Sequence, residues 1–132
     1  MGSGVVCGLQ TLVRPAPASK AGGWRRRIGL QVLNFVYFAQ HLLAQLYIES
    51  CLASAGHEVA RQSYHASGQE CHNVIAEVPG GEAAEEIVII GAHYDTVAGC
   101  PGANDNGTGV AAMLCLAKRF SGASLGRTLR FL

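Results

Sequence analysis

The stretch that most constrains this chain runs from Ile87 to Ala112 and reads as a strand, a glycine-rich polar loop and the start of a helix. Its first part, IVII (residues 87–90), is apolar throughout and rich in β-branched side chains, so it has no polar face. Such a run is typical of an inner strand that is covered on both sides, as in a parallel sheet. We therefore expect residues 87–90 to form a buried strand of an α/β fold.

Polar residues first appear where this strand ends. In open α/β sheets, ligands bind just beyond the carboxyl ends of strands, which is where His93 and Asp95 fall. Side chains two apart on an extended chain share a side, so these two should point one way and Tyr94 the other. A loop that contains glycine and proline should then bring Asp105 close to His93 and Asp95. An imidazole and a carboxylate are good zinc ligands, and Asp95 could hold the second ring nitrogen of a bound histidine.

Each of these residues also has a simpler interpretation when it is taken alone. A histidine near a strand end is more often hydrogen-bonded than metal-bound, and Asp105 could be only a helix N-cap. Glycines supply positive φ in turns without any ligand. Only the complete pattern of strand, His-x-Asp, Asn-Asp-Asn-Gly-Thr-Gly and apolar helix favours a metal site.

Two segments, GAHYDTV (residues 91–97) and PGANDNGTGVAA (residues 101–112), resemble the first metal-binding segment of the M28 zinc metallopeptidases, the aminopeptidase Y and glutamate carboxypeptidase group. The similarity extends from about Tyr47 to Leu132. The resemblance implies that His93 binds one Zn²⁺, that Asp105 bridges two, and that Asp95 is the catalytic-site aspartate that orients His93. It also implies a cis peptide bond after Asp105.

The family's other metal ligands, a glutamate, an aspartate and a histidine, and its general-base glutamate would all follow Leu132. We therefore expect residues 28–132 to be the incomplete N-terminal part of a zinc-peptidase α/β domain. Its fold should be three-layer α/β/α with a mixed, partly parallel central sheet, truncated on the C-terminal side, with residues 127–132 as the next core strand. Two ligands of five should not hold a zinc pair, so this part alone is expected to be inactive.

The activity that the resemblance implies is hydrolysis of peptide substrates by a dinuclear-zinc exopeptidase of the aminopeptidase type. Glutaminyl cyclase and carboxypeptidase relatives share the motif, so they are alternatives. A non-catalytic or phosphate-binding α/β fragment is another, because helix N-termini bind anions. However, the loop matches neither G-x-G-x-x-G nor G-x-x-x-x-G-K-[ST], and the carboxylate of Asp105 would repel phosphate.

Residues 1–27 are expected to form a flexible basic arm. Residues 1–48 contain five bases and no acid, whereas all nine acids follow, so the basic bias belongs to the arm. Three arginines at 25–27 can touch nucleic acid or anionic lipid, but we expect a solvated cluster and no nucleic-acid partner. The arm contains no convincing signal peptide, so cytoplasmic and secreted locations both stay open, as does the oligomeric state.

Residues 28–55 are the longest helical candidate, with Gly56 as its stop. No residue between Ile28 and Ile48 is charged, so a membrane span must be considered. Five polar residues nevertheless fall within one narrow sector of the helix: Gln31, Asn34, His41, Gln45 and Glu49. We therefore expect an amphipathic helix that covers the sheet, and membrane association is the lesser alternative.

The remaining segments give shorter elements. Residues 57–66 and 72–78 read as two strands joined around Gly68, and residues 82–86 as a solvated acidic connection. Residues 107–120 read as a helix that ends before Gly122. His57, His65 and His72 have no metal-ligand spacing. The five cysteines form no C-x-x-C pair, so they indicate neither a disulfide framework nor a thiolate zinc site, although Cys100 lies in the proposed site loop.

Overall fold

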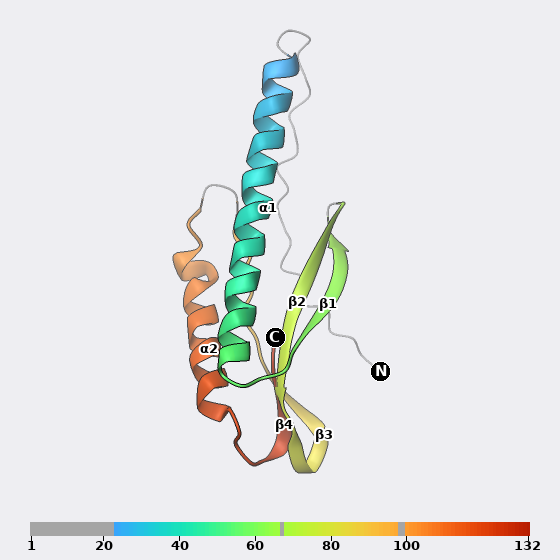
Figure 1. Cartoon of the computed structure of the whole chain (residues 1–132), viewed down its shortest axis with the longest axis vertical. Helices are drawn as coiled ribbons and strands as arrows, with labels where there is room; N and C mark the ends of the chain where they lie inside the picture. The colour runs from blue at the N-terminus through green and yellow to red at the C-terminus, as the bar shows by residue number, and fades with distance from the viewer. Residues whose placement is uncertain (1–22, 67, 98–99) are drawn as a thin grey trace.

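The computed structural model describes residues 23–66, 68–97 and 100–132, with side chains from residue 39 onward (Figure 1). These described residues form two α-helices, one π-helical turn and four strands. In chain order they are α1 (Gly23–Ser54), β1 (Val59–Ala66), β2 (Gln69–Val78), β3 (Gly80–Ile90), η1 (Ala103–Gly107), α2 (Thr108–Phe120) and β4 (Leu125–Phe131).

The four strands form one mixed sheet in the order β1-β2-β4-β3. β1 and β2 are antiparallel, β2 and β4 are antiparallel, and β3 and β4 are parallel. The α/β class and the mixed, partly parallel sheet are therefore confirmed. The expected hairpin is present, because Ala66 pairs with Gln69 across a turn in which Gly68 has a φ of 77°.

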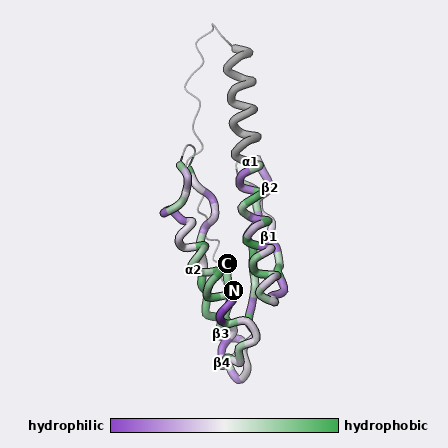
Figure 2. Tube along the Cα trace, turned by 60° about the vertical axis from the view of Figure 1, so that its left-hand side comes forward, coloured by the Kyte–Doolittle hydropathy of each residue, from purple (hydrophilic) through white to green (hydrophobic). Residues whose placement is uncertain are grey.

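Both helices contribute to one hydrophobic core on a single face of the sheet. Strand residues two apart share a face, and Ala76 and Val78 lie opposite Phe131 and Leu129, so these four point to the same side. The buried cluster joins them to residues of both helices, which are Ile48, Leu52, Met113 and Ala117. In Figure 2 the stretch of α2 beside its label is coloured hydrophobic, which agrees with this packing. The described residues thus form two of the three expected layers.

The position of β3 differs from the expectation for residues 87–90. β3 lies at an edge of the sheet, and Ile87, Val88 and Ile89 are between 44% and 56% exposed. The expectation of an inner strand covered on both sides is wrong within the described part of the chain, because Ile87 and Ile89 point away from the helices. β3 also begins at Gly80, so the acidic segment 82–86 belongs to the strand, with two register shifts, and is no loop.

Helix α1 begins at Gly23, before the expected start at residue 28, and ends ahead of Gly56, whose φ is 89°. Residues 1–22 of the expected basic arm lie outside the described residues. Within the residues that the structure describes, none of the helices combines the length and the apolar character that a membrane crossing requires.

The rotation of α1 about its axis is the reverse of what its polar sector indicated. Gln45 is only 2% exposed and faces the sheet beside Ile48, whereas Leu43 and Tyr47 are 66% and 65% exposed. The inward polar side chains have partners: Gln45 donates to the carboxylate of Glu49 at 2.8 Å, and Glu49 pairs with Arg61 of β1 at 2.6 Å. The helix covers the sheet as expected, but part of its polar sector meets β1 instead of solvent.

Truncating two leucines of α1 tests this rotation. Leu52→Ala should lower the free energy of unfolding by about 2–5 kcal/mol, because Leu52 is 1% exposed and its removal leaves a cavity. Leu43→Ala, the matched control on the same helix, should change it by less than about 0.5 kcal/mol, because that side chain is already solvated. Urea unfolding measures both variants, and a larger loss for Leu43→Ala would show that the opposite side of α1 packs on the sheet.

Candidate functional site

The site begins where the ladder between β3 and β4 stops. Ile90 pairs with Phe131, and the amide of Leu132 then donates to the carbonyl of Ile90 at 3.0 Å. The amide of Ala92 donates to the carbonyl of Leu132 at 2.9 Å and closes the ladder. The chain therefore leaves the sheet at His93, at the carboxyl end of β3, where the sequence placed the site.

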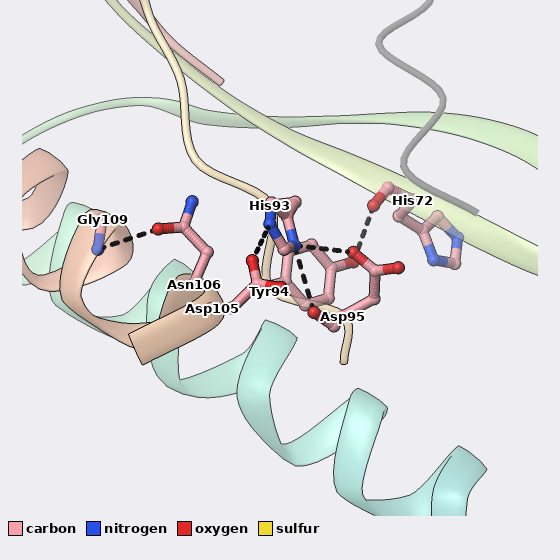
Figure 3. A network of polar contacts seen from close by, with 7 residues as sticks. All are labelled: His72, His93, Tyr94, Asp95, Asp105, Asn106 and Gly109. Carbon is pink, nitrogen blue, oxygen red and sulfur yellow. Dashed lines mark hydrogen bonds and ion pairs between the residues drawn. The ribbon is translucent and has the colours of Figure 1, made fainter. Parts of the chain in front are cut away.

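His93 lies between two aspartates (Figure 3). Its Nδ1 is 3.1 Å from the backbone carbonyl of Asp95 and 3.2 Å from its Oδ1, while its Nε2 is 3.0 Å from Oδ1 of Asp105. Tyr94 points to the other side, so the expected alternation of side chains is confirmed. The structure thus brings together all three residues that the sequence singled out.

The electrostatics of this group favour positive charge on the imidazole. Burial by itself lowers the pKa of His93, but the hydrogen bond to the Asp95 backbone and the charges of Asp95 and Asp105 outweigh it and raise the pKa above its ordinary value. Two carboxylates that stabilise a proton on the ring are also suited to stabilise a metal cation bound to that ring.

Asp105 is free to take part because another residue caps the following helix. Oδ1 of Asn106 accepts the backbone N–H of Gly109 at 3.2 Å, which satisfies an amide in the first turn of α2. The interpretation of Asp105 as the N-cap is therefore wrong. Its side chain is 92% exposed and presents Oδ1 to His93. The peptide bond between Asp105 and Asn106 is cis, as the resemblance implied.

Two glycines allow the loop to close around these residues. Gly102 has a φ of 67°, and a Cβ there would lie 3.0 Å from Cβ of Thr96. A Cβ on Gly109 would lie 2.2 Å from Oδ1 of Asn106, so the capping contact requires glycine. The structure of the loop therefore explains glycine at both positions, whether or not a ligand binds nearby.

Behind His93 lies a second group of contacts that the sequence did not predict. The hydroxyl of Tyr94 donates to the backbone carbonyl of His72 on β2 at 2.6 Å, and its ring lies 4.7 Å from the ring of His41 on α1. Burial raises the pKa of Tyr94 and lowers that of His41, although the charge of Asp95 partly opposes the latter shift. Alternation along the chain indicated the side on which Tyr94 lies, but no local signal identified its partners.

The other histidines and Cys100 do not extend the group into a full metal centre. His57 packs against Phe131, and its Nε2 is 2.8 Å from the carbonyl of Ala117. Cys100 is an exposed free thiol. In the part of the chain with described side chains, no three histidine, cysteine, aspartate or glutamate residues gather as a metal site.

His93 and Asp105 nevertheless suit a shared zinc ion. Zinc binds imidazole nitrogen and carboxylate oxygen at about 2.0–2.2 Å in tetrahedral geometry, which separates two donor atoms by roughly 3.3 Å. Nε2 of His93 and Oδ1 of Asp105 are 3.0 Å apart, so a small widening would admit the ion. The described residues thus supply two possible metal donors, His93 and Asp105, and the carboxylate of Asp95 at the other nitrogen of the histidine.

Comparison with known proteins yields one family and several relatives. Residues 73–132 match the sequence profile of peptidase family M28. The chain is 39% identical over 87 residues to leupeptin-inactivating enzyme 1 of Streptomyces exfoliatus, covering 64% of this chain and 20% of that protein. It is 42% identical over 59 residues to leucine aminopeptidase 2 of Trichophyton equinum, covering 45% of this chain and 12% of that protein.

The fold is also found in a solved structure. The crystal structure of glutaminyl cyclase from Macrostomum lignano superposes with a TM-score of 0.57 at 22% identity, covering 69% of this chain and 30% of that chain. At this identity the likeness shows a common fold alone. The chain spans 20% or less of the length of the two peptidase relatives, so it corresponds to a small part of each.

The pKa of His93 provides a test of the charge arrangement. In an NMR titration of the metal-free chain we expect it above 6.5, and we expect Asp95→Asn to lower it because an acceptor charge is lost. Glu85→Gln, which removes one charge elsewhere, is the control and should leave it unchanged. Because the folded pKa is raised, the stabilisation is complete below pH 6.5 and is lost as the pH rises through the folded pKa. A wild-type pKa below 6.5 would contradict the geometry.

The contact between Asn106 and Gly109 can be tested by a double-mutant cycle. In the otherwise wild-type chain Gly109→Ala should leave the free energy of unfolding nearly unchanged, because loss of the displaced capping contact, about 1 kcal/mol, offsets the gain in helix propensity, also about 1 kcal/mol. In an Asn106→Ala background the cap is already absent, so the same change should stabilise by up to ~1 kcal/mol through helix propensity. Thermal unfolding followed by circular dichroism gives both values, and an equal effect in the two backgrounds would show that Asn106 does not cap α2.

Proposed function

We propose that this chain, whose residues 73–132 match the profile of peptidase family M28, supplies His93 and Asp105 as zinc ligands to a metal-dependent hydrolase of the aminopeptidase type. Asp95 would orient His93 through its Nδ1. The proposal concerns one part of a larger site, because the described residues contain no cluster of three metal donors.

One observation carries this proposal: a single imidazole has a carboxylate at each of its two nitrogens. Stability alone gives little reason for this arrangement, because an ion pair with a carboxylate that is 92% exposed contributes little to folding. In metal sites, by contrast, a ligand histidine commonly donates its second N–H to a carboxylate or carbonyl, and Asp95 offers both acceptors.

Each of the three residues has a defined task. With zinc bound, Asp95 would accept the Nδ1–H of His93, so that the lone pair of Nε2 would be directed at the metal. Asp105, whose side chain is 92% exposed, would hold the same ion, and its carboxylate has a second oxygen that would remain available as a metal donor. When bound, zinc would lower the pKa of a water molecule and polarise a peptide carbonyl.

The substrate class follows from the named relatives. One relative is called a leucine aminopeptidase, and on that name we propose peptides with a free N-terminal residue as substrates of the complete enzyme. With two donors among the described residues, we propose that this part of the chain does not hold a zinc pair by itself and does not catalyse hydrolysis.

Phosphate binding at the start of α2 is less consistent with the structure. The backbone N–H of Gly109, which a phosphate would need, is already bonded to Asn106. The neighbouring carboxylate of Asp105 would also repel an anion unless a metal lay between them. These contacts favour a cation at this site.

Zinc titration tests the proposal. His93→Ala and Asp105→Asn should each weaken zinc binding at least about tenfold, because even residues behind metal ligands contribute that much. His65→Ala and Glu85→Gln remove an exposed imidazole and an exposed carboxylate outside the site and serve as controls. Competition with a chromophoric chelator gives the affinities. Equal losses in the site variants and their controls, or nucleotide binding without metal, would contradict the proposal.

A further inference from the structure

The segment that carries His93 and Asp95 makes few backbone hydrogen bonds to the other described residues. The ladder hydrogen bonds end at Ala92, and the next backbone–backbone bond along the described chain joins the amide of Cys100 to the carbonyl of Val97 at 3.1 Å. Between these points, no backbone–backbone bond to another described residue holds residues 93–96. The direction of their side chains must therefore depend on side-chain contacts.

Tyr94 supplies the main contacts on the side of the core. Its ring packs against the hydrophobic cluster and lies 4.7 Å from the ring of His41, with the two planes tilted by 35°. Its hydroxyl donates to the carbonyl of His72 at 2.6 Å. One side chain thus ties the segment to α1 and to β2 at once.

Fixing Tyr94 also fixes its neighbours. In an extended chain successive side chains point to opposite sides, so a core-facing Tyr94 turns His93 and Asp95 outward together. They meet there at 3.2 Å, and His93 reaches Asp105 with its other nitrogen (Figure 3). A rotation of the segment that released the tyrosine hydroxyl would swing Nε2 of His93 away from Asp105.

We infer that Tyr94, held by the ring of His41 and the carbonyl of His72, is a positioning residue for the metal centre. It touches neither His93 Nε2 nor Asp105 Oδ1 and acts by setting the direction of the side chains on either side of it. The inference rests on the proposed zinc site and adds to it a group that works from the opposite side of the segment.

The contact is suited to this task because it holds under all ordinary conditions. A phenol keeps its proton at neutral pH, so the hydroxyl of Tyr94 remains a donor. Its acceptor is a backbone carbonyl within the hydrogen-bonded hairpin of β1 and β2, where His72 pairs with Ser63. The hydroxyl of Tyr94 therefore holds the segment in position relative to β2.

Tyr94→Phe tests the inference, because it removes only the hydroxyl and keeps the ring. Zinc affinity should fall about tenfold, as for other residues that orient a metal ligand. Tyr47→Phe removes an exposed phenol from the outer side of α1 and is the matched control, with affinity unchanged. His41→Ala, which removes the ring contact, should weaken zinc binding in the same direction. Far-ultraviolet circular dichroism verifies that each variant is folded.

A second measurement needs no metal. In an Asp105→Ala background, where that carboxylate no longer faces Nε2, ¹⁵N NMR of neutral His93 should show the proton on Nδ1, because two acceptors of Asp95 face that atom. When Tyr94→Phe is added to this background, the proton should distribute over both nitrogens, which a purely stabilising role for Tyr94 would not cause. An unchanged tautomer in this background and wild-type zinc affinity in a folded Tyr94→Phe chain would overturn the inference. If the wild-type chain bound no zinc, the proposed function would fail, and the tautomer would still decide whether Tyr94 positions His93.

Discussion

The site depends first on where the parallel pairing of β3 with β4 ends. Residues 87–90 pair with residues 128–131 without a register shift, and Leu132 completes the ladder by bonding to Ile90 and Ala92. Because side chains alternate along a strand, a slip of one residue would turn His93 towards the core and Tyr94 towards solvent. The register of one strand pair therefore determines which side chains can reach Asp105.

The second support is the inward polar side of α1. Gln45 and Glu49 link the helix to Arg61 of β1, while His41 lies against Tyr94. No buried side-chain nitrogen or oxygen among the described residues lacks a hydrogen-bond partner, so this polar contact does not carry the cost of an unsatisfied group. The helix thus packs through Ile48 and Leu52 and, on the same side, connects the core to the segment that bears His93.

Local sequence patterns predicted much of the fold and the group of His93, Asp95 and Asp105. Alternation and glycine positions are properties of neighbouring residues, so they identified the hairpin, the start of the site and the two helix stops. The rotation of α1 was not predictable, because periodicity finds a polar sector but not the charge on another strand that meets it, here Arg61. The exposure of β3 was missed for a related reason, since an apolar run indicates what a strand can bury and not which elements lie beside it.

The central claim, that His93 and Asp105 share one cation, is tested most directly by an anomalous-difference map from crystals of the zinc-loaded chain. The shared-ion geometry predicts a zinc peak within roughly 2.0–2.2 Å of both His93 Nε2 and Asp105 Oδ1. A zinc ion bound elsewhere, for example at the thiolate of Cys100, with His93 and Asp105 still in direct contact with each other, would contradict it.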